Sequence, residues 1–556
     1  MAAVDQRSSG GSAAAPGSVG RGAAAFGLDR FDLAVLLSLA GLSLAFLFWI
    51  LVRGGVFAGW EGFVVADQGQ YLSWVREASE NVLMANRFDM QPDSHVYLHP
   101  ALLLSGLVHA VGVSTPLAYL LWKPVAVAVL FVGVRAYIRR TLESKWERRV
   151  ALVLALFFVS PAAVLSPLWG EAGRGTFDFI SGEISPPGQF WGYPFGAIAI
   201  GLTPLVFLWA ERALHAGPPA AGGRWVALAA GAALVASALH PWQGAIIIGV
   251  LGVAGLWHSL AHEITPAEVA RKLWPVFLAP LLPALYYFVL ARVDASWEIT
   301  ESNYSTPLNA LMTARVGVAL APLALAAVLA YLARGRRGFQ DRILLLWAPL
   351  VVVLYLIPAT PVRFHAFNGL SIPLAILAVR GLSPYLGRMA ALDGHRRRLV
   401  GAGVAAACAF LIVPGTFDRV RSARGAVYLN EQPYLLEPGE RDALDALERA
   451  PEGGVMAPVN LAALVPYRTG HETWVGTPSW SPDFGERAAH VSNLFAGRLS
   501  PQQGRRLVRT SGVRYVLADC RVTADLRPLL APLADATPHG CATLFELRRQ
   551  PQTATG

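Results

Sequence analysis

The sequence LAVLLSLAGLSLAFLFWILV, residues Leu33–Val52, is a run of 20 residues without a single charge. A helix needs about 20 mostly apolar residues to cross the hydrocarbon core of a bilayer. The run is longer than the apolar segment of a signal peptide, and no small-residue cleavage site follows it promptly. We therefore expect the chain to enter a membrane here with a retained span.

Apolar runs of this kind recur as far as residue 416. Hydrophobic residues make up 54% of the 556 residues and charged residues only 15%, whereas ordinary soluble domains carry about 25% charged residues. The pattern predicts an all-α polytopic membrane bundle of about eleven spans. The further spans are expected near 115–137, 148–168, 190–210, 225–240, 243–260, 273–291, 308–333, 343–358, 366–382 and 399–416.

The composition divides the chain into three parts. Residues 1–28 are rich in Gly, Ala and Ser and are expected to be a disordered cytoplasmic segment. Residues 29–416 form the transmembrane domain, with outer loops at 53–114 and 169–189. Residues 417–556 alternate predicted helices and strands, which indicates a small soluble α/β domain. Its elements are expected as a helix at 438–449, a strand at 454–457, a helix at 484–495, and helix–strand pairs at 503–518 and 524–548.

The distribution of Lys and Arg predicts the orientation, because cytoplasmic loops carry an excess of both. With the amino terminus inside, the cytoplasmic loops hold 19 Lys and Arg residues and the outer loops six. An odd number of spans then places the C-terminal domain outside the cytoplasm of a multi-pass cell-membrane protein. The net charge of +9 reflects this topology, and no nucleic-acid-binding module accompanies it.

Three cysteines leave one structural question open. Cys408 lies in an apolar run and is interpreted as a core residue. Cys520 and Cys541 flank predicted strands of the tail, and they could form a disulfide in an extracytoplasmic domain.

The strongest candidate for chemistry lies in the first outer loop, which begins WEGFVVADQGQY at Trp60. Asp67 is placed at the membrane edge, just before an amphipathic helical stretch from Tyr71 to Val82. A carboxylate near apolar surface tends to have a raised pKa, which suits a general base for a hydroxyl. The alternative is that Asp67 is a helix N-cap.

Asp67-Gln68-x-x-Tyr71 resembles the aspartate motif of GT-C glycosyltransferases, which are polytopic membrane enzymes that use polyprenyl-phosphate-linked sugars. In many members an acidic pair precedes the tyrosine, whereas here the second position is Gln68. That departure weakens the case for a metal and leaves Asp67 as the motif's carboxylate. The spans, outer loops and soluble tail are also similar in architecture. In the tail, Gly470–Arg487 resembles a Gly-His…Pro-Asp…Arg segment of some bacterial members. No catalytic role is carried onto these residues, and a capped turn beside a packed core strand is the preferred interpretation.

Other polar groups at the outer ends of the spans could complete a site. Arg363 is the candidate for the lipid phosphate because its planar fork of donors suits phosphate, the alternative being a snorkelling residue. His365 could add a donor or satisfy a backbone carbonyl. His240 lies in a predicted turn between two helices, and Trp242 beside it offers a face for a sugar or belongs to the interfacial aromatic belt.

The second outer loop adds Glu171 and Asp178, which occur near Trp and Tyr residues and are candidate substrate ligands. His95 and His99 are four apart, a spacing that metal ligands can use on a helix, but prolines at 92 and 100 argue against a regular helix there. We therefore predict no cofactor; a divalent metal is not indicated, and metal dependence stays open at this point. Soluble-enzyme signatures such as a phosphate-binding loop are absent from the sequence.

The resemblance implies an inverting glycosyl transfer at the extracytoplasmic face. The partners would be a polyprenyl-phosphate-linked sugar donor, membrane lipids, and a cell-envelope glycan, lipid or protein acceptor. Asp67 would act as general base. The alternatives are a transporter or flippase for a lipid-linked substrate, which would place charged residues at the bilayer midplane, and a non-catalytic protein with the same architecture.

Overall fold

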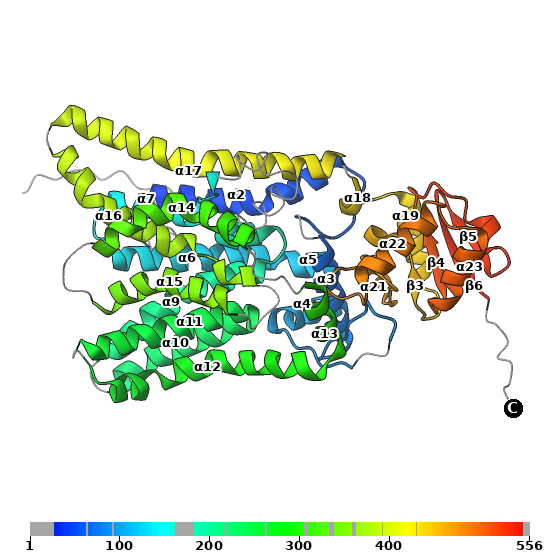
Figure 1. Cartoon of the computed structure of the whole chain (residues 1–556), viewed down its shortest axis with the longest axis horizontal. Coiled ribbons are helices and arrows are strands. Elements are labelled where there is room, and N and C mark those ends of the chain that lie inside the picture. The colour runs from blue at the N-terminus through cyan, green and yellow to red at the C-terminus, as the bar shows by residue number, and fades with distance from the viewer. Residues whose placement is uncertain are drawn as a thin grey trace, which may run out of the picture.

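The computed structural model of the chain consists of a long helical bundle with a small domain at one end (Figure 1). The structure describes residues 27–62, 65–91, 94–161, 183–216, 219–261, 264–304, 310–332, 338–357, 363–391, 393–429 and 431–548. Within these ranges, nine helices are long and apolar enough to cross a membrane. The expected multi-pass helical membrane domain is therefore confirmed.

The bundle helices follow the predicted spans closely. Two of the expected spans, near 148–168 and 308–333, are not among the nine. They overlap α7 (Lys145–Phe157) and α14 (Ala310–Leu332), and the described apolar part of α14 is Gly317–Leu332. The bundle is made of α2 (Arg30–Arg53), α5 (Thr115–Leu120), α6 (Trp122–Thr141), α7 (Lys145–Phe157), α9 (Pro194–His215), α10 (Pro219–Leu239), α11 (Pro241–Leu260), α12 (Pro266–Val293), α14 (Ala310–Leu332), α15 (Phe339–Leu356), α16 (Ser371–Ala390) and α17 (Gly394–Leu429).

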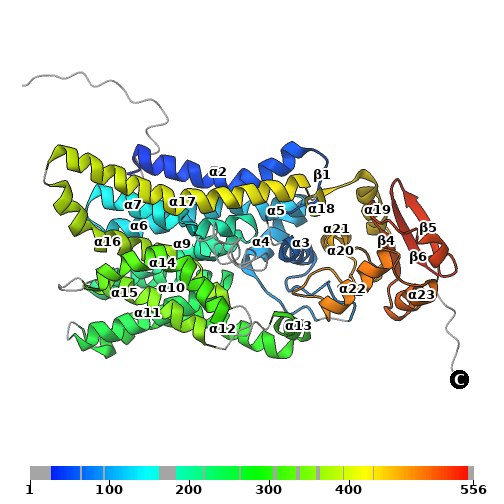
Figure 2. The same cartoon turned by 45° about the horizontal axis from the view of Figure 1, so that its top comes forward.

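The helix α17 runs beside α2 along one side of the bundle (Figure 2). It continues without a break to Leu429, so the last helix extends beyond residue 416, where the sequence pattern places the end of the bundle. The turn expected at His240 is present, because α10 ends at Leu239 and α11 begins at Pro241.

Helix α9 lies at the centre of the bundle and is buried along most of its length. It packs on α6 through Gly133 and Gly201, where a Cβ on either glycine would lie within 2.7 Å of the other helix's backbone. Small residues at such a crossing let two membrane helices approach closely. This close packing fixes the position of α9, whose N-cap residue is Tyr193.

One end of the bundle is covered by three shorter helices, α3 (Val65–Glu80), α4 (Pro100–Ala110) and α13 (Ala295–Tyr304), and the C-terminal domain lies against this end (Figure 1). The strands β1 (Val56–Phe57) and β2 (Leu435–Leu436) pair antiparallel and join the first loop to the start of that domain. Trp60 donates its indole N–H to the Pro433 carbonyl at 2.6 Å. The C-terminal domain is thus attached to the loop that carries Asp67.

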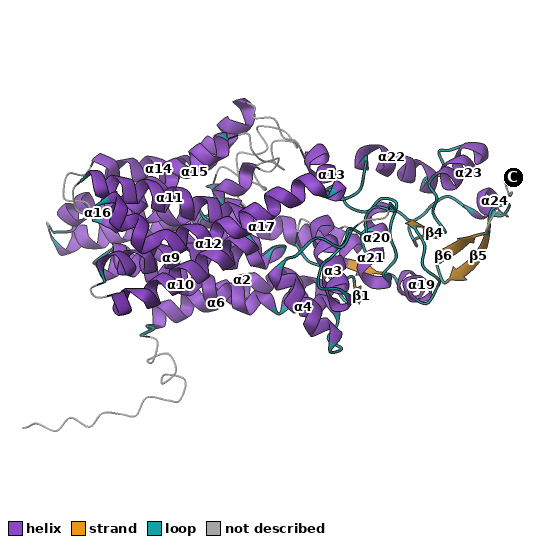
Figure 3. Ribbon diagram, turned by 90° about the horizontal axis from the view of Figure 1, so that it is seen from below, coloured by secondary structure: helices purple, strands orange, loops and turns teal. Residues whose placement is uncertain are grey.

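The C-terminal domain is a four-stranded sheet with helices (Figure 3), as the predicted alternation indicated. The strand order is β3-β4-β6-β5, with β3 parallel to β4 and the other pairs antiparallel. Residues 524–548 hold one short helix and a two-stranded hairpin, so the expectation of one helix and one strand there is wrong. The elements are α18 (Glu431–Tyr434), α19 (Pro438–Glu448), β3 (Val455–Met456), α20 (Val459–Ala462), α21 (Val465–Thr469), α22 (Phe484–Phe495), α23 (Pro501–Thr510), β4 (Tyr515–Ala518), α24 (Arg527–Leu530), β5 (Ala534–His539) and β6 (Ala542–Leu547).

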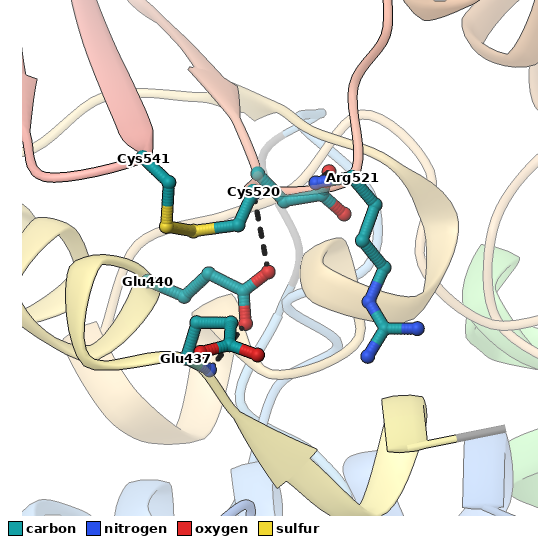
Figure 4. The surroundings of a disulfide bond; sticks show 6 residues. Glu437, Glu440, Cys520, Arg521 and Cys541 are labelled. Carbon is teal, nitrogen blue, oxygen red and sulfur yellow. Dashed lines mark hydrogen bonds between the residues drawn. A yellow bond between two sulfur atoms is a disulfide. The ribbon is translucent and has the colours of Figure 1, made fainter.

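A disulfide between Cys520 and Cys541 joins the end of β4 to the start of β6 (Figure 4). Beside it, the Glu440 carboxylate accepts hydrogen bonds from the Glu437 and Cys520 amides at 2.9 and 3.3 Å. The pairing that the sequence left open is therefore present.

Candidate functional site

Asp67 lies in the first turn of α3, at the end of the bundle that faces the C-terminal domain. Because α3 already begins at Val65, the N-cap interpretation of Asp67 is wrong. Its Oδ1 instead accepts a hydrogen bond from the Ser479 hydroxyl at 3.0 Å. Ser479 belongs to the C-terminal domain, more than 400 residues away in sequence.

The surroundings of Asp67 favour its protonated form. Burial raises the pKa of the Asp67 carboxyl, while the Ser479 hydrogen bond and the charge of His365 act against that rise. The charge of Glu183 adds a smaller upward contribution to this pKa. A carboxylate with a raised pKa is a better proton acceptor than an ordinary aspartate.

His365 and Asn368 form a hydrogen-bonded network with Glu183, which is buried just before the short helix η2 (Pro186–Trp191). His365 Nδ1 lies 3.1 Å from Glu183 Oε2, and Asn368 Nδ2 donates to the same oxygen at 2.7 Å. Gln189 donates to the Asn368 side-chain oxygen at 2.8 Å, and Gln243 donates to its carbonyl at 3.1 Å. Glu183 therefore holds His365 at a defined position near Asp67.

His240 joins this network from the turn between α10 and α11. Its ring centre lies 5.4 Å from that of His365, and its Nε2 lies 3.4 Å from Asn368 Nδ2. Burial, with a smaller contribution from the charge of His365, lowers the pKa of His240 to about 3, so this ring is neutral at physiological pH. Its buried Nδ1 has no hydrogen-bond partner among the residues that the structure describes, which leaves that atom available to a ligand.

Tyr71 lies one helical turn after Asp67 on α3. Its ring is stacked on Tyr119 and lies 5.2 Å from the ring of Tyr193, which in turn lies 6.1 Å from that of His240. Tyr71 and His240, both predicted as site residues, are thus joined through Tyr193. Trp242 is half-buried against the core, and no described contact connects it to these residues.

Arg363 begins the short helix η3 (Arg363–Phe367), which also contains His365. Its side chain is half-buried, and Nε has no hydrogen-bond partner among the described parts of the chain. A buried guanidinium nitrogen without a partner costs free energy, and an anionic ligand would offset that cost. Arg363 therefore places a guanidinium nitrogen without a described partner on the same short helix as His365.

Gln68, the departure from the acidic pair, has a structural role. Its amide oxygen accepts from the Glu61 amide at 3.0 Å, and its amide nitrogen donates to the Glu61 carbonyl. The Glu61 side chain forms a buried ion pair with Lys123 of α6, and Lys123 also donates to the carbonyls of Ser43 and Phe190. Gln68 thus ties the backbone at Glu61 to α3, and this helix also carries Asp67.

Other predicted residues lie elsewhere. Glu171 and Asp178 fall in residues 162–182, outside the described ranges. His95 lies 3.1 Å from Glu77, whereas His99 caps α4 by accepting from the Leu102 amide at 3.3 Å. Within the described residues, no group of three or more His, Cys, Asp or Glu side chains is placed to hold a metal ion.

Three residues in the site were not on the sequence-based list. Ser479 lies in the TPSWSPD stretch that resembled a family segment, and the resemblance was the only signal for it. Glu183 and Asn368 were adjacent to predicted candidates, but nothing in the sequence paired one with the other. The site is therefore assembled from five separate parts of the chain, around Asp67, Glu183, His240, His365 and Ser479.

The chain is similar in fold to solved membrane enzymes. ArnT from Cupriavidus metallidurans, solved with bound undecaprenyl phosphate, shares 13% identity with a TM-score of 0.50 over 94% of this chain and 98% of that one. AglB, an oligosaccharyltransferase from Archaeoglobus fulgidus, shares 12% identity with a TM-score of 0.45 over 94% of this chain and 75% of that one. No protein-family model and no curated protein sequence matches the chain. The similarity to ArnT shows that this chain shares the overall fold of that membrane protein.

Proposed function

We propose that this protein is a membrane glycosyltransferase that moves a sugar from a polyprenyl-phosphate donor to an acceptor hydroxyl with inversion. The observation that carries the proposal is Asp67, a carboxylate with a raised pKa that already accepts a hydrogen bond from a hydroxyl. The GT-C fold supports the same class of reaction, and the undecaprenyl phosphate bound to ArnT supports a polyprenyl carrier.

In this mechanism Asp67 removes the proton of the acceptor hydroxyl. The hydroxyl oxygen attacks the anomeric carbon, and the bond from that carbon to the phosphate oxygen breaks on the opposite face. The bonding electrons leave with the phosphate, so the anomeric centre is inverted. Because the site lies in a partly water-excluded region, each charge acts more strongly than it would in water.

Arg363 and His365 would stabilise the departing phosphate. Arg363 offers guanidinium donors, and its Nε has no partner in the described residues. Glu183 supports a proton on His365 through its contact with Nδ1, which leaves the other ring nitrogen free to face the ligand. The acceptor would approach from the side of the C-terminal domain, where Ser479 contacts Asp67.

The orientation of the site follows from the Lys and Arg distribution. Predicted cytoplasmic loops hold 19 of these residues and outer loops six, which supports an extracytoplasmic site and C-terminal domain. A cell-envelope glycan, lipid or protein with a free hydroxyl is then the acceptor class.

The test is transfer in membranes from a panel of radiolabelled polyprenyl-phosphate sugars to a crude envelope acceptor. Asp67→Asn keeps an oxygen that can accept from Ser479, so folding should be preserved, while transfer falls by about 10²–10⁴-fold because the base is lost. Glu80→Gln, an exposed acid at the end of the same helix, should leave transfer unchanged. Equal transfer by Asp67→Asn and wild type would contradict the role of Asp67.

The same assay gives a pH profile. Because the base acts only when ionised, transfer should fall as the pH drops through the raised pKa of Asp67. The acid limb should therefore lie above the range of an ordinary aspartate, which is near 4. A rate that stays constant down to about pH 4 would contradict this assignment.

A further inference from the structure

The segment Thr477–Asp483, here called the 477–483 loop, reaches from the C-terminal domain onto the bundle. Trp480 of this loop packs between Trp74 of α3 and Trp297 of α13, with ring centres 5.0 and 5.2 Å away. Asn86 donates to the Trp480 carbonyl at 2.9 Å, and the Thr300 hydroxyl donates to the Ser479 carbonyl at 2.8 Å. These contacts bring Ser479 to Asp67.

The loop has an internal structure that can be kept while it moves. The Ser481 hydroxyl accepts from the amides of Gly476 and Thr477 at 2.9 and 3.3 Å. The loop ends at Asp483, the only non-glycine residue with a positive φ in the described chain, at 48°. Aspartate tolerates this conformation better than most residues, and residues held in it often lie at segments with a functional constraint.

The hydrogen bond from Ser479 to Asp67 is of the same kind as the bond that an acceptor hydroxyl would form with Asp67 before the proposed reaction. In both cases an aliphatic hydroxyl donates to the carboxylate of the base, which in the proposed reaction then takes the proton. Ser479 is 8% exposed, so the loop also covers the approach to Asp67 from the side of the C-terminal domain.

We propose that the 477–483 loop closes the acceptor side of the site, with the Ser479 hydroxyl occupying the position on Asp67 that an acceptor hydroxyl takes. This inference rests on the proposed function. The acceptor binds by displacing Ser479, and the loop leaves as one piece because its internal hydrogen bonds do not depend on Asp67. The C-terminal domain thereby controls access to the base.

The first test does not require activity. Dicyclohexylcarbodiimide modifies protonated carboxyl groups in apolar surroundings, and peptide mass spectrometry reports the modification of Asp67 as a function of pH. The charged groups that face Asp67 are His365 and Glu183, and both remain unchanged in the variants. Ser479→Ala removes a hydrogen bond that lowers the Asp67 pKa and uncovers the carboxyl, so modification should become faster and its midpoint should move to higher pH. Ser479→Thr retains the hydroxyl and should behave as wild type.

The second test uses transfer kinetics. A competing hydrogen bond of ordinary net strength weakens acceptor binding about fivefold, so Ser479→Ala should lower the acceptor KM by about that factor and leave the donor KM unchanged. Thr300→Val removes a hydrogen bond that holds Ser479 in place but changes neither Ser479 nor Asp67. It should therefore lower the acceptor KM and move the midpoint of Asp67 modification in the same direction as Ser479→Ala, by a smaller amount in each case.

Two results would overturn the inference. One is modification of Asp67 in Ser479→Ala at the wild-type rate and midpoint. The other is an acceptor KM in Ser479→Ala that is unchanged or raised, since Ser479 would then stay in place during the reaction. A wild-type protein that transfers no sugar would remove the proposed function, yet carbodiimide modification would still decide whether Ser479 covers Asp67.

Discussion

Replacing Glu183 by glutamine should slow transfer about 30-fold without disturbing the fold. Glu183 Oε2 contacts His365 Nδ1 at 3.1 Å and Asn368 Nδ2 at 2.7 Å, and its side chain is only 8% exposed. A glutamine oxygen can take both contacts, so the change removes charge and keeps shape. A hydrogen bond to a charged group contributes about 1 kcal/mol more than a neutral one, so two bonds lose about 2 kcal/mol, which corresponds to about 30-fold in rate.

The assay compares kcat/KM for the donor in wild type, Glu183→Gln and Glu298→Gln, all purified in the same detergent. Glu298 is an exposed acid on α13 at the same end of the bundle, and its neutralisation controls for general electrostatic effects. A Glu183→Gln enzyme within about twofold of wild type would refute the reasoning, because His365 would then not depend on its anionic partner.

Three further perturbations test separate parts of the structure. Arg363→Lys keeps the charge but loses the planar fork, so the donor KM should rise about tenfold while the acceptor KM stays constant in the same transfer assay. Lys123→Met leaves the Glu61 carboxylate buried without its cation and should cost about 3–5 kcal/mol in thermal unfolding; adding Glu61→Gln should recover most of this loss. Cys520→Ser opens the 21-residue link to Cys541 and should destabilise the C-terminal domain by about 3 kcal/mol, seen as faster proteolysis that reducing agent reproduces in wild type.

The membrane domain could be predicted because length and apolarity are local properties of a segment. Composition alone was enough to predict helices at Leu33–Val52 and after His240, and the structure has α2 and α11 at these positions. The extension of α17 to Leu429 could not be seen in the same way, since the residues beyond 416 include charges such as Asp418 and Arg419. A helix that leaves the bilayer keeps its backbone hydrogen bonds but loses the apolar signal that marks it.

The candidate site was predictable only in part, because it depends on contacts between distant segments. Asp67 was found from its position after the first span and from its resemblance to a motif. The contact of Asp67 with Ser479 joins residues more than 400 positions apart, and no periodicity encodes such a pair. Gln68 illustrates the same limit. The sequence shows only that a glutamine replaces the second acid of the motif, whereas its structural role becomes clear from the hydrogen bond between its side-chain amide and the Glu61 backbone.

The positions of the ion pairs bear on the choice between a transferase and a transporter. A transporter for a charged, lipid-linked substrate needs polar groups near the bilayer midplane. Among the described residues of the bundle, the ion pairs that the structure shows gather toward its two ends. Toward the C-terminal domain are Glu61–Lys123 and Glu183–His365, and at the opposite end are Asp32–Arg135, Glu211–Arg140 and Asp341–Arg380.

The ion pairs at the end away from the C-terminal domain connect helices near the loops rich in Lys and Arg. The pair Glu183–His365 instead lies beside Asp67. An arrangement with one such polar site at one end of the bundle favours chemistry at a membrane face over passage through it.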